Sequence, residues 1–126
     1  VGENPSRKTL SSHQIRKLLE LQDDSCFYCG SNISKNNSDA DHFIPWSFVL
    51  ETDVFNMVQA CKSCNSSKND HLPNENYFDK LQNRNISDDF LDSFEFEPKK
   101  AKDKNRILEI YFNDCSLYFE EGWSSN

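Results

Sequence analysis

The chain has 126 residues, which suffices for one domain of ordinary size and is too short for two. Hydrophobic residues make up 36% of it and aromatic residues 13%, which excludes a disordered chain, and no apolar run approaches the roughly 20 residues of a membrane-spanning helix. The net charge is −7, whereas a free-standing nucleic-acid-binding domain is usually basic.

The N-terminal part of the chain predicts a cytoplasmic fragment that begins with a helix. The segment VGENPSRKTL lacks the apolar core of a signal peptide and starts with Val rather than Met, so we expect a piece of a longer protein. Ser11 and Gln14 have the spacing of a capping box, and apolar residues follow at helical spacing. These signals predict an N-terminal helix in residues 11–22, in which Ser11 is the N-cap and the helical residues begin at 12.

The middle of the chain predicts a hairpin followed by a helix. Residues 31–38 are a polar loop, and residues 40–46 read as a strand that Pro45 stops. A second strand is predicted at 54–60, where residues that favour extended structure gather, with 47–53 as the connection. The segment 64–72 then reads as a short helix that ends before Pro73.

The C-terminal part predicts a helical extension over residues 75–121. A helix is expected at 75–83, whereas 84–103 is compatible with a short helix or a packed loop. The charged segment at 97–105 has the composition of an exposed linker. A closing helix is expected at 103–121, because its apolar residues share one face. These are Ile107, Leu108, Tyr111, Cys115, Tyr118 and Phe119.

Four of the five cysteines form two C-x2-C pairs, Cys26 with Cys29 and Cys61 with Cys64. Two such pairs supply the four soft ligands of a tetrahedral structural zinc. A disulfide framework is disfavoured because nothing marks the chain as secreted, and a redox C-x2-C motif would explain one pair only. We therefore predict a four-cysteine zinc site and interpret Cys115 as a buried free thiol.

Between and beside the cysteine pairs, several polar residues follow in a specific order. The segment DADHFIP spans residues 39–45, Asn56 follows in the second strand, and CKSCNSSK spans residues 61–68. This order resembles the HNH endonuclease family over about residues 26–73, and the segments before 24 and after 75 carry no part of the resemblance. The resemblance implies an α+β fold with a ββα-metal core stapled by the four-cysteine zinc and flanked by N- and C-terminal helices, and a single HNH nuclease domain in residues 1–126.

The resemblance also implies a role for each matching residue. Asp41 and Asn65 would hold a catalytic Mg²⁺ or Mn²⁺ through hard oxygen atoms, although the family often has His at the second position. His42 would be the general base that activates water. Asn56 would orient the loop that carries His42, and Lys68 would contact a phosphate.

Each of these residues has an ordinary structural interpretation as well. Asn65 suits a helix cap, Asn56 a polar strand position, and Lys68 the exposed face of a helix. Two questions stay open: whether His71 is a further metal ligand, and whether Asp39 supports the metal ligands without binding the cation. An acidic cluster near the cation is expected, and its members are Asp39, Asp41, Asp53 and Asp70.

The resemblance implies phosphodiester hydrolysis in a nucleic acid, with double-stranded DNA as the expected partner. Because the chain is acidic, we expect a separate recognition domain or partner chain to supply affinity. Restriction or phage defence is the expected setting, by analogy alone. The alternative is a catalytically inactive zinc module that binds nucleic acid or protein. A two-zinc interaction domain is disfavoured, since it would need four more well-spaced ligands.

Overall fold

A computed structural model describes residues 8–125, so most of the segment on which the signal-peptide argument rests lies outside the described residues. The helices and strands within this range are α1 (Ser12–Leu21), β1 (Ser38–His42), α2 (Trp46–Val49), β2 (Met57–Cys61), α3 (Lys62–Lys68), α4 (Glu75–Asn85), α5 (Asp88–Phe94) and α6 (Pro98–Ser116). The predicted α+β class is confirmed. None of the helices within the described range has the length and hydrophobicity needed to cross a bilayer.

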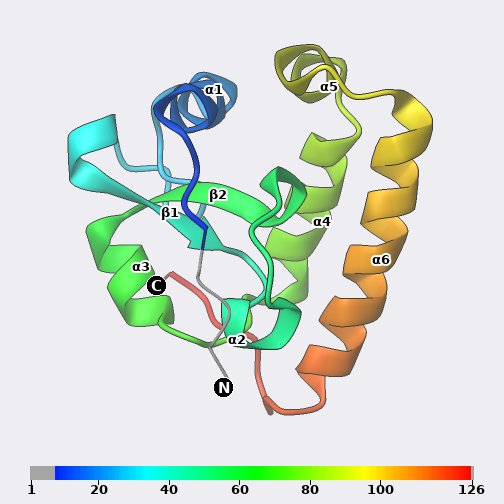
Figure 1. Ribbon diagram of the computed structural model, residues 1–126. Coiled ribbons are helices and arrows are strands. Elements are labelled where there is room, and N and C mark those ends of the chain that lie inside the picture. Colours follow the sequence, from blue (N-terminus) through cyan, green and yellow to red (C-terminus); the bar gives the residue numbers. More distant parts are fainter. Residues whose placement is uncertain (1–7, 126) are drawn as a thin grey trace, which may run out of the picture.

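The two strands form an antiparallel hairpin at the centre of the fold. Its register pairs Ser38 with Cys61 at one end and His42 with Met57 at the other. Helix α3 follows β2 directly and lies on one side of the hairpin, while α4 and α6 lie on the other side (Figure 1). The sequence β1, β2, α3 is therefore a ββα unit enclosed by the remaining helices.

The hairpin differs from the prediction at its edges. The first strand ends at His42 rather than continuing to Pro45, because Phe43 and Ile44 leave the sheet and turn into the core. The second strand begins at Met57, since residues 54–56 form a 3-10 turn. The connection contains the short helix α2. Helix α3 starts at 62, two residues earlier than predicted, and ends at 68 rather than 72.

Helix α1 forms as predicted, with its N-terminus closed by the capping box. The Ser11 side chain accepts from the Gln14 amide at 3.1 Å, and the Gln14 side chain accepts from the Ser11 amide at 2.9 Å. After the helix ends, the Gln22 side chain donates to the Gln59 carbonyl at 2.8 Å and accepts from the Gln59 amide at 2.9 Å. This pair of bonds joins the end of α1 to β2 and fixes where the first cysteine pair begins.

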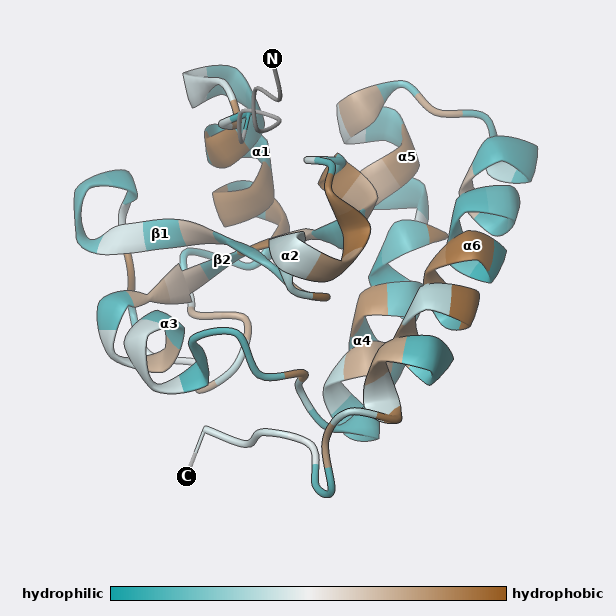
Figure 2. Cartoon of the chain, turned by 60° about the horizontal axis from the view of Figure 1, so that its bottom comes forward, coloured by the Kyte–Doolittle hydropathy of each residue, from teal (hydrophilic) through white to brown (hydrophobic). Residues whose placement is uncertain are grey.

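The C-terminal extension is more helical than predicted. Residues 84–103 include α5 and the start of α6, and the predicted linker at 97–105 is the hydrophilic beginning of that helix (Figure 2). Pro98 occupies a first-turn position that suits proline, and Ala101 is fully buried. Because Ala101 is a small apolar residue among charged ones, this segment has little hydrophobic periodicity, and its helix was not predicted. The helix ends at 116 rather than 121, and Tyr118 is exposed.

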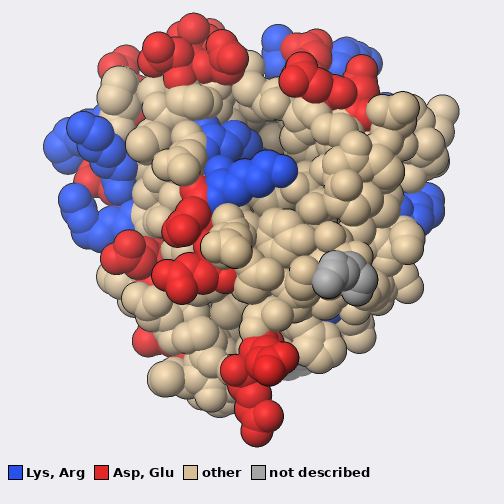
Figure 3. All heavy atoms as spheres, turned by 180° about the vertical axis from the view of Figure 1, so that it is seen from behind, with Lys and Arg blue, Asp and Glu red and all other residues tan. Residues whose placement is uncertain are grey.

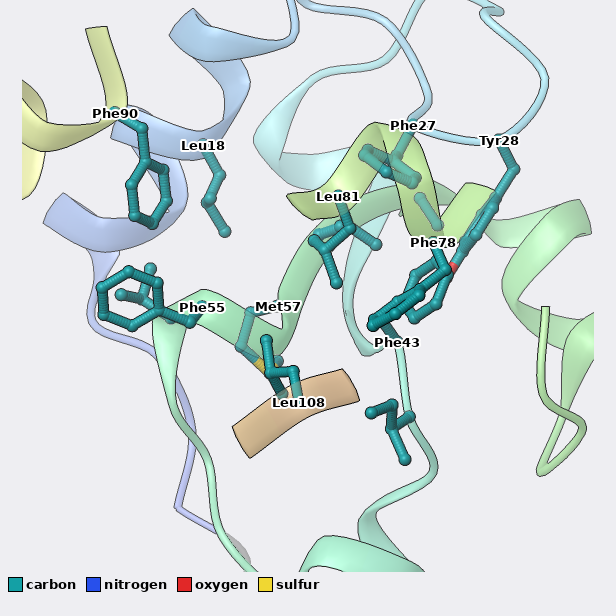
Figure 4. Close-up of a cluster of buried hydrophobic side chains, with 14 of the residues drawn as sticks. Leu18, Phe27, Tyr28, Phe43, Phe55, Met57, Phe78, Leu81, Phe90 and Leu108 are labelled. Atoms are coloured by element: carbon teal, nitrogen blue, oxygen red, sulfur yellow. The ribbon is translucent and has the colours of Figure 1, made fainter. Parts of the chain in front are cut away.

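An aromatic core connects the C-terminal helices to the hairpin. Phe78 of α4 stacks on Phe112 of α6 with ring centroids 4.1 Å apart, and Phe43 lies 6.0 Å from Phe78. Tyr28 stacks on Phe43 with ring centroids 6.2 Å apart (Figure 4). Since Phe43 directly follows His42, this packing holds the end of β1 in place.

Candidate active site

The four cysteines of the two C-x2-C pairs converge on one point. Their sulfur atoms all lie within 4.8 Å of one another, and the Sγ atoms of Cys29 and Cys61 are 3.8 Å apart. A tetrahedral zinc with metal–sulfur bonds of about 2.3 Å requires sulfur–sulfur separations of about 3.8 Å. The four thiols are therefore positioned to bind a metal ion, and zinc suits both the donor set and the spacing.

Local backbone structure shapes both cysteine pairs. Gly30, with a φ of +78°, turns the chain directly after Cys29. The second pair uses the start of α3, where the Cys64 amide donates to Cys61 Sγ at 3.3 Å. The hydrogen bond between Cys29 and Ser31 lowers the pKa of the Cys29 thiol to about 6, which favours the thiolate that a metal binds.

A cleft of about 610 Å³ lies between the end of β1, the start of α2, and the second half of α3 with the turn that follows it. It brings together three of the predicted site residues, Asp41, His42 and Asn65, although Asn65 is more than 20 positions further along the chain. They meet because hairpin pairing places α3 beside β1. The complete lining is Ala40, Asp41, His42, Pro45, Trp46, Asn65, Ser66, Asn69 and Asp70.

Asp41 is almost completely buried at the bottom of this cleft, with 6% of its surface exposed. The Tyr28 hydroxyl donates to its Oδ2 at 2.5 Å, and the Lys68 ammonium lies 3.3 Å from each carboxylate oxygen. Burial raises the pKa of the Asp41 carboxyl, and the neighbouring ammonium opposes that shift. The two donors thus stabilise a charged carboxylate in a poorly solvated position.

Lys68 lies inside the protein and not on an exposed helix face. Its ammonium donates to the His42 carbonyl at 2.9 Å and pairs with Asp41, and its side chain is 1% exposed. Burial lowers the pKa of Lys68. The predicted contact between Lys68 and a phosphate does not fit this position, since its charge is used within the fold.

The side-chain amide of Asn65 is oriented by Asp39. Its Nδ2 lies 3.1 Å from Asp39 Oδ2, and a carboxylate only accepts, so the amide nitrogen faces Asp39 and the amide oxygen is the remaining donor atom for a metal. Lys62 pairs with the other Asp39 oxygen at 2.7 Å. Asp39 therefore lies behind Asn65 and orients it. One carboxylate and one amide are the hard oxygen ligands that Mg²⁺ or Mn²⁺ accepts.

The ring of His42 is oriented by a hydrogen-bond chain. Its Nε2 lies 2.9 Å from the Thr52 hydroxyl, and that hydroxyl donates to the Lys8 carbonyl at 2.7 Å. Because a hydroxyl has one proton to donate, it accepts from His42, and Nε2 carries the proton of the neutral ring. The basic lone pair then resides on Nδ1.

Asn56 ties down the loop after His42. Its Oδ1 accepts from the Ile44 amide at 2.9 Å and its Nδ2 donates to the Ile44 carbonyl at 3.0 Å, while its own carbonyl accepts from Phe43 at 2.8 Å. The side chain is buried. These are the bonds that a role in orienting the His42 loop requires.

Other residues singled out in the sequence lie elsewhere. His71 is exposed, outside the cleft lining, with Nδ1 3.1 Å from the Lys68 carbonyl. Asp53 was expected in the acidic cluster but forms an ion pair with Lys104 at 2.6 Å and lies outside the cleft. Cys115 is buried, as predicted, and is not part of the four-cysteine cluster.

Sequence reasoning missed Tyr28 and Thr52, the partners of Asp41 and His42. Tyr28 lies between two cysteines and reads as a spacer, and Thr52 lies in the connection between the strands. Neither has a local signal, because both act on residues at least ten positions away. The only hint is that a buried tyrosine hydroxyl needs a hydrogen-bond partner.

The chain is similar to known nucleases. The HNH endonuclease family matches at residues 26–71. The CRISPR-associated endonuclease Cas9 of Corynebacterium diphtheriae is 38% identical over 69 residues, which are 54% of this chain and 6% of that protein. The type II-C Cas9 enzyme of Actinomyces naeslundii aligns with a TM-score of 0.47 at 18% identity, over 85% of this chain and 13% of that one.

The chain thus spans a small part of the length of both relatives. The matched segment contains both cysteine pairs, the hairpin and α3, and so includes every residue of the ββα unit described above. Residues 26–71 of this chain thus match the HNH endonuclease family, and this similarity supports a nuclease-type function.

Proposed function

We propose that the chain is a metal-dependent HNH endonuclease module that hydrolyses phosphodiester bonds in DNA. The observation that carries the proposal is the cleft shared by Asp41, His42 and Asn65. It joins a candidate general base to two oxygen ligands beside a hairpin that the aromatic core and the cysteine cluster hold in place.

The protein groups have separate tasks in the proposed reaction. His42, with its lone pair on Nδ1, removes a proton from the attacking water, and Thr52 holds the ring in that tautomer. Asp41 and Asn65 would hold a divalent cation, and such a cation would supply positive charge to stabilise the scissile phosphate and the leaving oxygen. Asn56 holds the loop after His42 in position through its hydrogen bonds to the Ile44 backbone. The products carry 5′-phosphate and 3′-hydroxyl ends.

We propose a setting in antiviral defence, as one part of a larger protein. The relative from Corynebacterium diphtheriae is named as a CRISPR-associated endonuclease, which favours defence over restriction. The net charge of −7 means that this chain is poorly suited to attract DNA by itself. Other parts of the protein, or a partner chain, would therefore supply affinity and target choice.

Nicking of supercoiled plasmid tests the proposal. The zinc-loaded protein is incubated with Mg²⁺ or Mn²⁺, or with EDTA at a concentration that leaves the zinc bound. We expect cation-dependent nicking that His42→Ala reduces by at least about 100-fold, because general-base catalysis contributes roughly 10²–10⁴-fold. His71→Ala is the matched control, since His71 is exposed and lies outside the cleft.

One observation favours the alternative of a catalytically inactive zinc module. The ammonium of Lys68 already neutralises Asp41, so the carboxylate has a partner without a catalytic cation. Folded, zinc-loaded protein that nicks no plasmid with either cation, also when joined to the remainder of its parent protein, would favour this alternative. Equal activity in His42→Ala and wild type would exclude His42 as the base.

A further inference from the structure

Tyr28 connects the first cysteine pair to the cleft. It lies between Cys26 and Cys29, and its hydroxyl donates to Asp41 Oδ2 at 2.5 Å. The residue is 7% exposed, so its hydroxyl has little access to water. A buried tyrosine hydroxyl requires a hydrogen-bond partner, and here that partner is the carboxylate assigned to the cation.

The ring of Tyr28 is fixed by other aromatic rings on several sides. Tyr77 and Trp123 meet it edge-on with ring centroids 5.3 and 4.9 Å away. Phe43 stacks on it at 6.2 Å (Figure 4). Phenylalanine would satisfy the same ring contacts. The ring contacts therefore account for an aromatic residue at this position, and the hydrogen bond to Asp41 accounts for the hydroxyl.

The second group that holds Asp41 is anchored at the other cysteine pair. Lys68 lies one helical turn after Cys64 on α3, and its ammonium is 3.3 Å from both Asp41 oxygens. Asp41 is thus held between one side chain from within the first cysteine pair and one that follows the second pair. The two donors to the Asp41 carboxylate therefore lie in the same two chain segments as the four cysteines.

We propose that Tyr28 is a positioning residue that fixes the Asp41 carboxylate for the divalent cation and thereby couples the zinc site to the nuclease cleft. The inference rests on the proposed function, since it assumes that Asp41 is a cation ligand. Loss of the hydroxyl leaves the carboxylate with one donor and frees its rotation about the Cβ–Cγ bond. Second-sphere partners of metal ligands contribute about 10- to 100-fold to metal affinity.

The test compares Tyr28→Phe with Tyr77→Phe in the zinc-loaded chain of 126 residues. Tyr77 belongs to the same aromatic cluster, but its hydroxyl bonds to Ser125 at 2.9 Å, so its removal leaves Asp41 untouched. Free Mn²⁺ is measured by electron paramagnetic resonance. We expect Tyr28→Phe to raise the Kd for Mn²⁺ about 10-fold with unchanged zinc content, and Tyr77→Phe to match wild type.

Plasmid nicking as a function of Mn²⁺ concentration separates the role of Tyr28 from the nuclease activity itself. The half-saturating Mn²⁺ concentration should rise in Tyr28→Phe by the same factor as the Kd. If wild type binds Mn²⁺ and nicks DNA but Tyr28→Phe has the same Kd, the role of Tyr28 is wrong and the proposed function stands. If wild type neither binds Mn²⁺ nor nicks DNA, also when joined to the remainder of its parent protein, the proposed function fails and the role of Tyr28 with it.

A second measurement does not depend on folding of the Tyr28→Phe variant. All four tyrosines are replaced biosynthetically by 3-fluorotyrosine, and the ¹⁹F resonances are assigned by substituting the other three in turn. Mg²⁺ should shift the Tyr28 resonance and leave that of Tyr118, which is 77% exposed, in place. An unmoved Tyr28 resonance at Mg²⁺ concentrations that support nicking would overturn the proposal.

Discussion

At the scale of single residues, the most consequential contact is the buried ion pair between Lys68 and Asp41. Its two side chains are 1% and 7% exposed. The pair Lys62–Asp39 is shorter, at 2.7 Å, but its side chains are 62% and 36% exposed. Burial makes the Lys68–Asp41 pair the more important one for stability. Water screens the charges of the exposed pair, whereas a buried charge that loses its partner is not solvated by water instead.

We expect Lys68→Met to lower the free energy of unfolding by about 3–5 kcal/mol, because it leaves the Asp41 charge buried and unpaired. Lys62→Met, the same change on the same helix, should cost at most about 1 kcal/mol. The double variant Asp41→Asn, Lys68→Met should be more stable than Lys68→Met alone. Urea unfolding of the zinc-loaded proteins measures all three, and equal losses in the two single variants would contradict the assignment.

At the scale of elements, the cysteine cluster joins segments that the hairpin alone does not hold together. The turn at residues 26–29 follows α1, whereas Cys61 ends β2 and Cys64 lies in α3. These elements are short, with five residues in each strand and seven in α3. Short elements bury little apolar surface, so the metal contributes a large share of their stability.

Cys29→Ser and Cys115→Ala separate the metal ligands from the free thiol. We expect Cys29→Ser to lose most of its zinc and its cooperative thermal unfolding, since a structural zinc site needs all four ligands. Cys115→Ala should keep the zinc and lose about 1 kcal/mol from a small cavity. Metal content and circular dichroism melting are the measurements. Retention of a full zinc equivalent by Cys29→Ser would refute the four-cysteine site.

At the scale of the whole molecule, the distribution of charge limits what the chain does alone. Several basic side chains are used inside the fold: Lys68 pairs with Asp41, Lys104 pairs with Asp53, and Arg84 donates to backbone carbonyls that include that of Met57 at 2.6 Å. On the face that Figure 3 shows, acidic side chains gather in several groups between the basic ones. These three basic side chains are therefore not available for phosphate contacts, and the remaining ones are outnumbered by 21 acidic residues.

We expect the isolated chain to bind a DNA duplex of about 30 base pairs weakly, with a Kd of about 10⁻⁴ M or more at physiological salt, at the weak end of non-specific binding. Lowering the salt concentration should strengthen binding only slightly, because few counterions are released. Fluorescence anisotropy with Ca²⁺ in place of Mg²⁺ measures this affinity. Micromolar binding with a steep salt dependence would show that the chain carries its own DNA-binding surface.

Local patterns in the sequence were sufficient for much of this molecule. The capping box at Ser11 predicts the start of α1, and the two C-x2-C spacings predict the cysteine cluster, because a cap and a metal knuckle are each formed by residues close together in the chain. The order of polar residues likewise led to the HNH family and to the cleft residues Asp41, His42 and Asn65.

Tertiary structure alone decided the contacts that join distant segments. Lys68 reads as an exposed helix residue but is buried against Asp41, and the polar start of α6 reads as a linker but packs through Ala101. Tyr28 and Thr52 became site residues because folding placed them beside Asp41 and His42. Periodicity and spacing report what a segment does by itself, whereas burial and hydrogen-bond partners depend on which other segments pack against it.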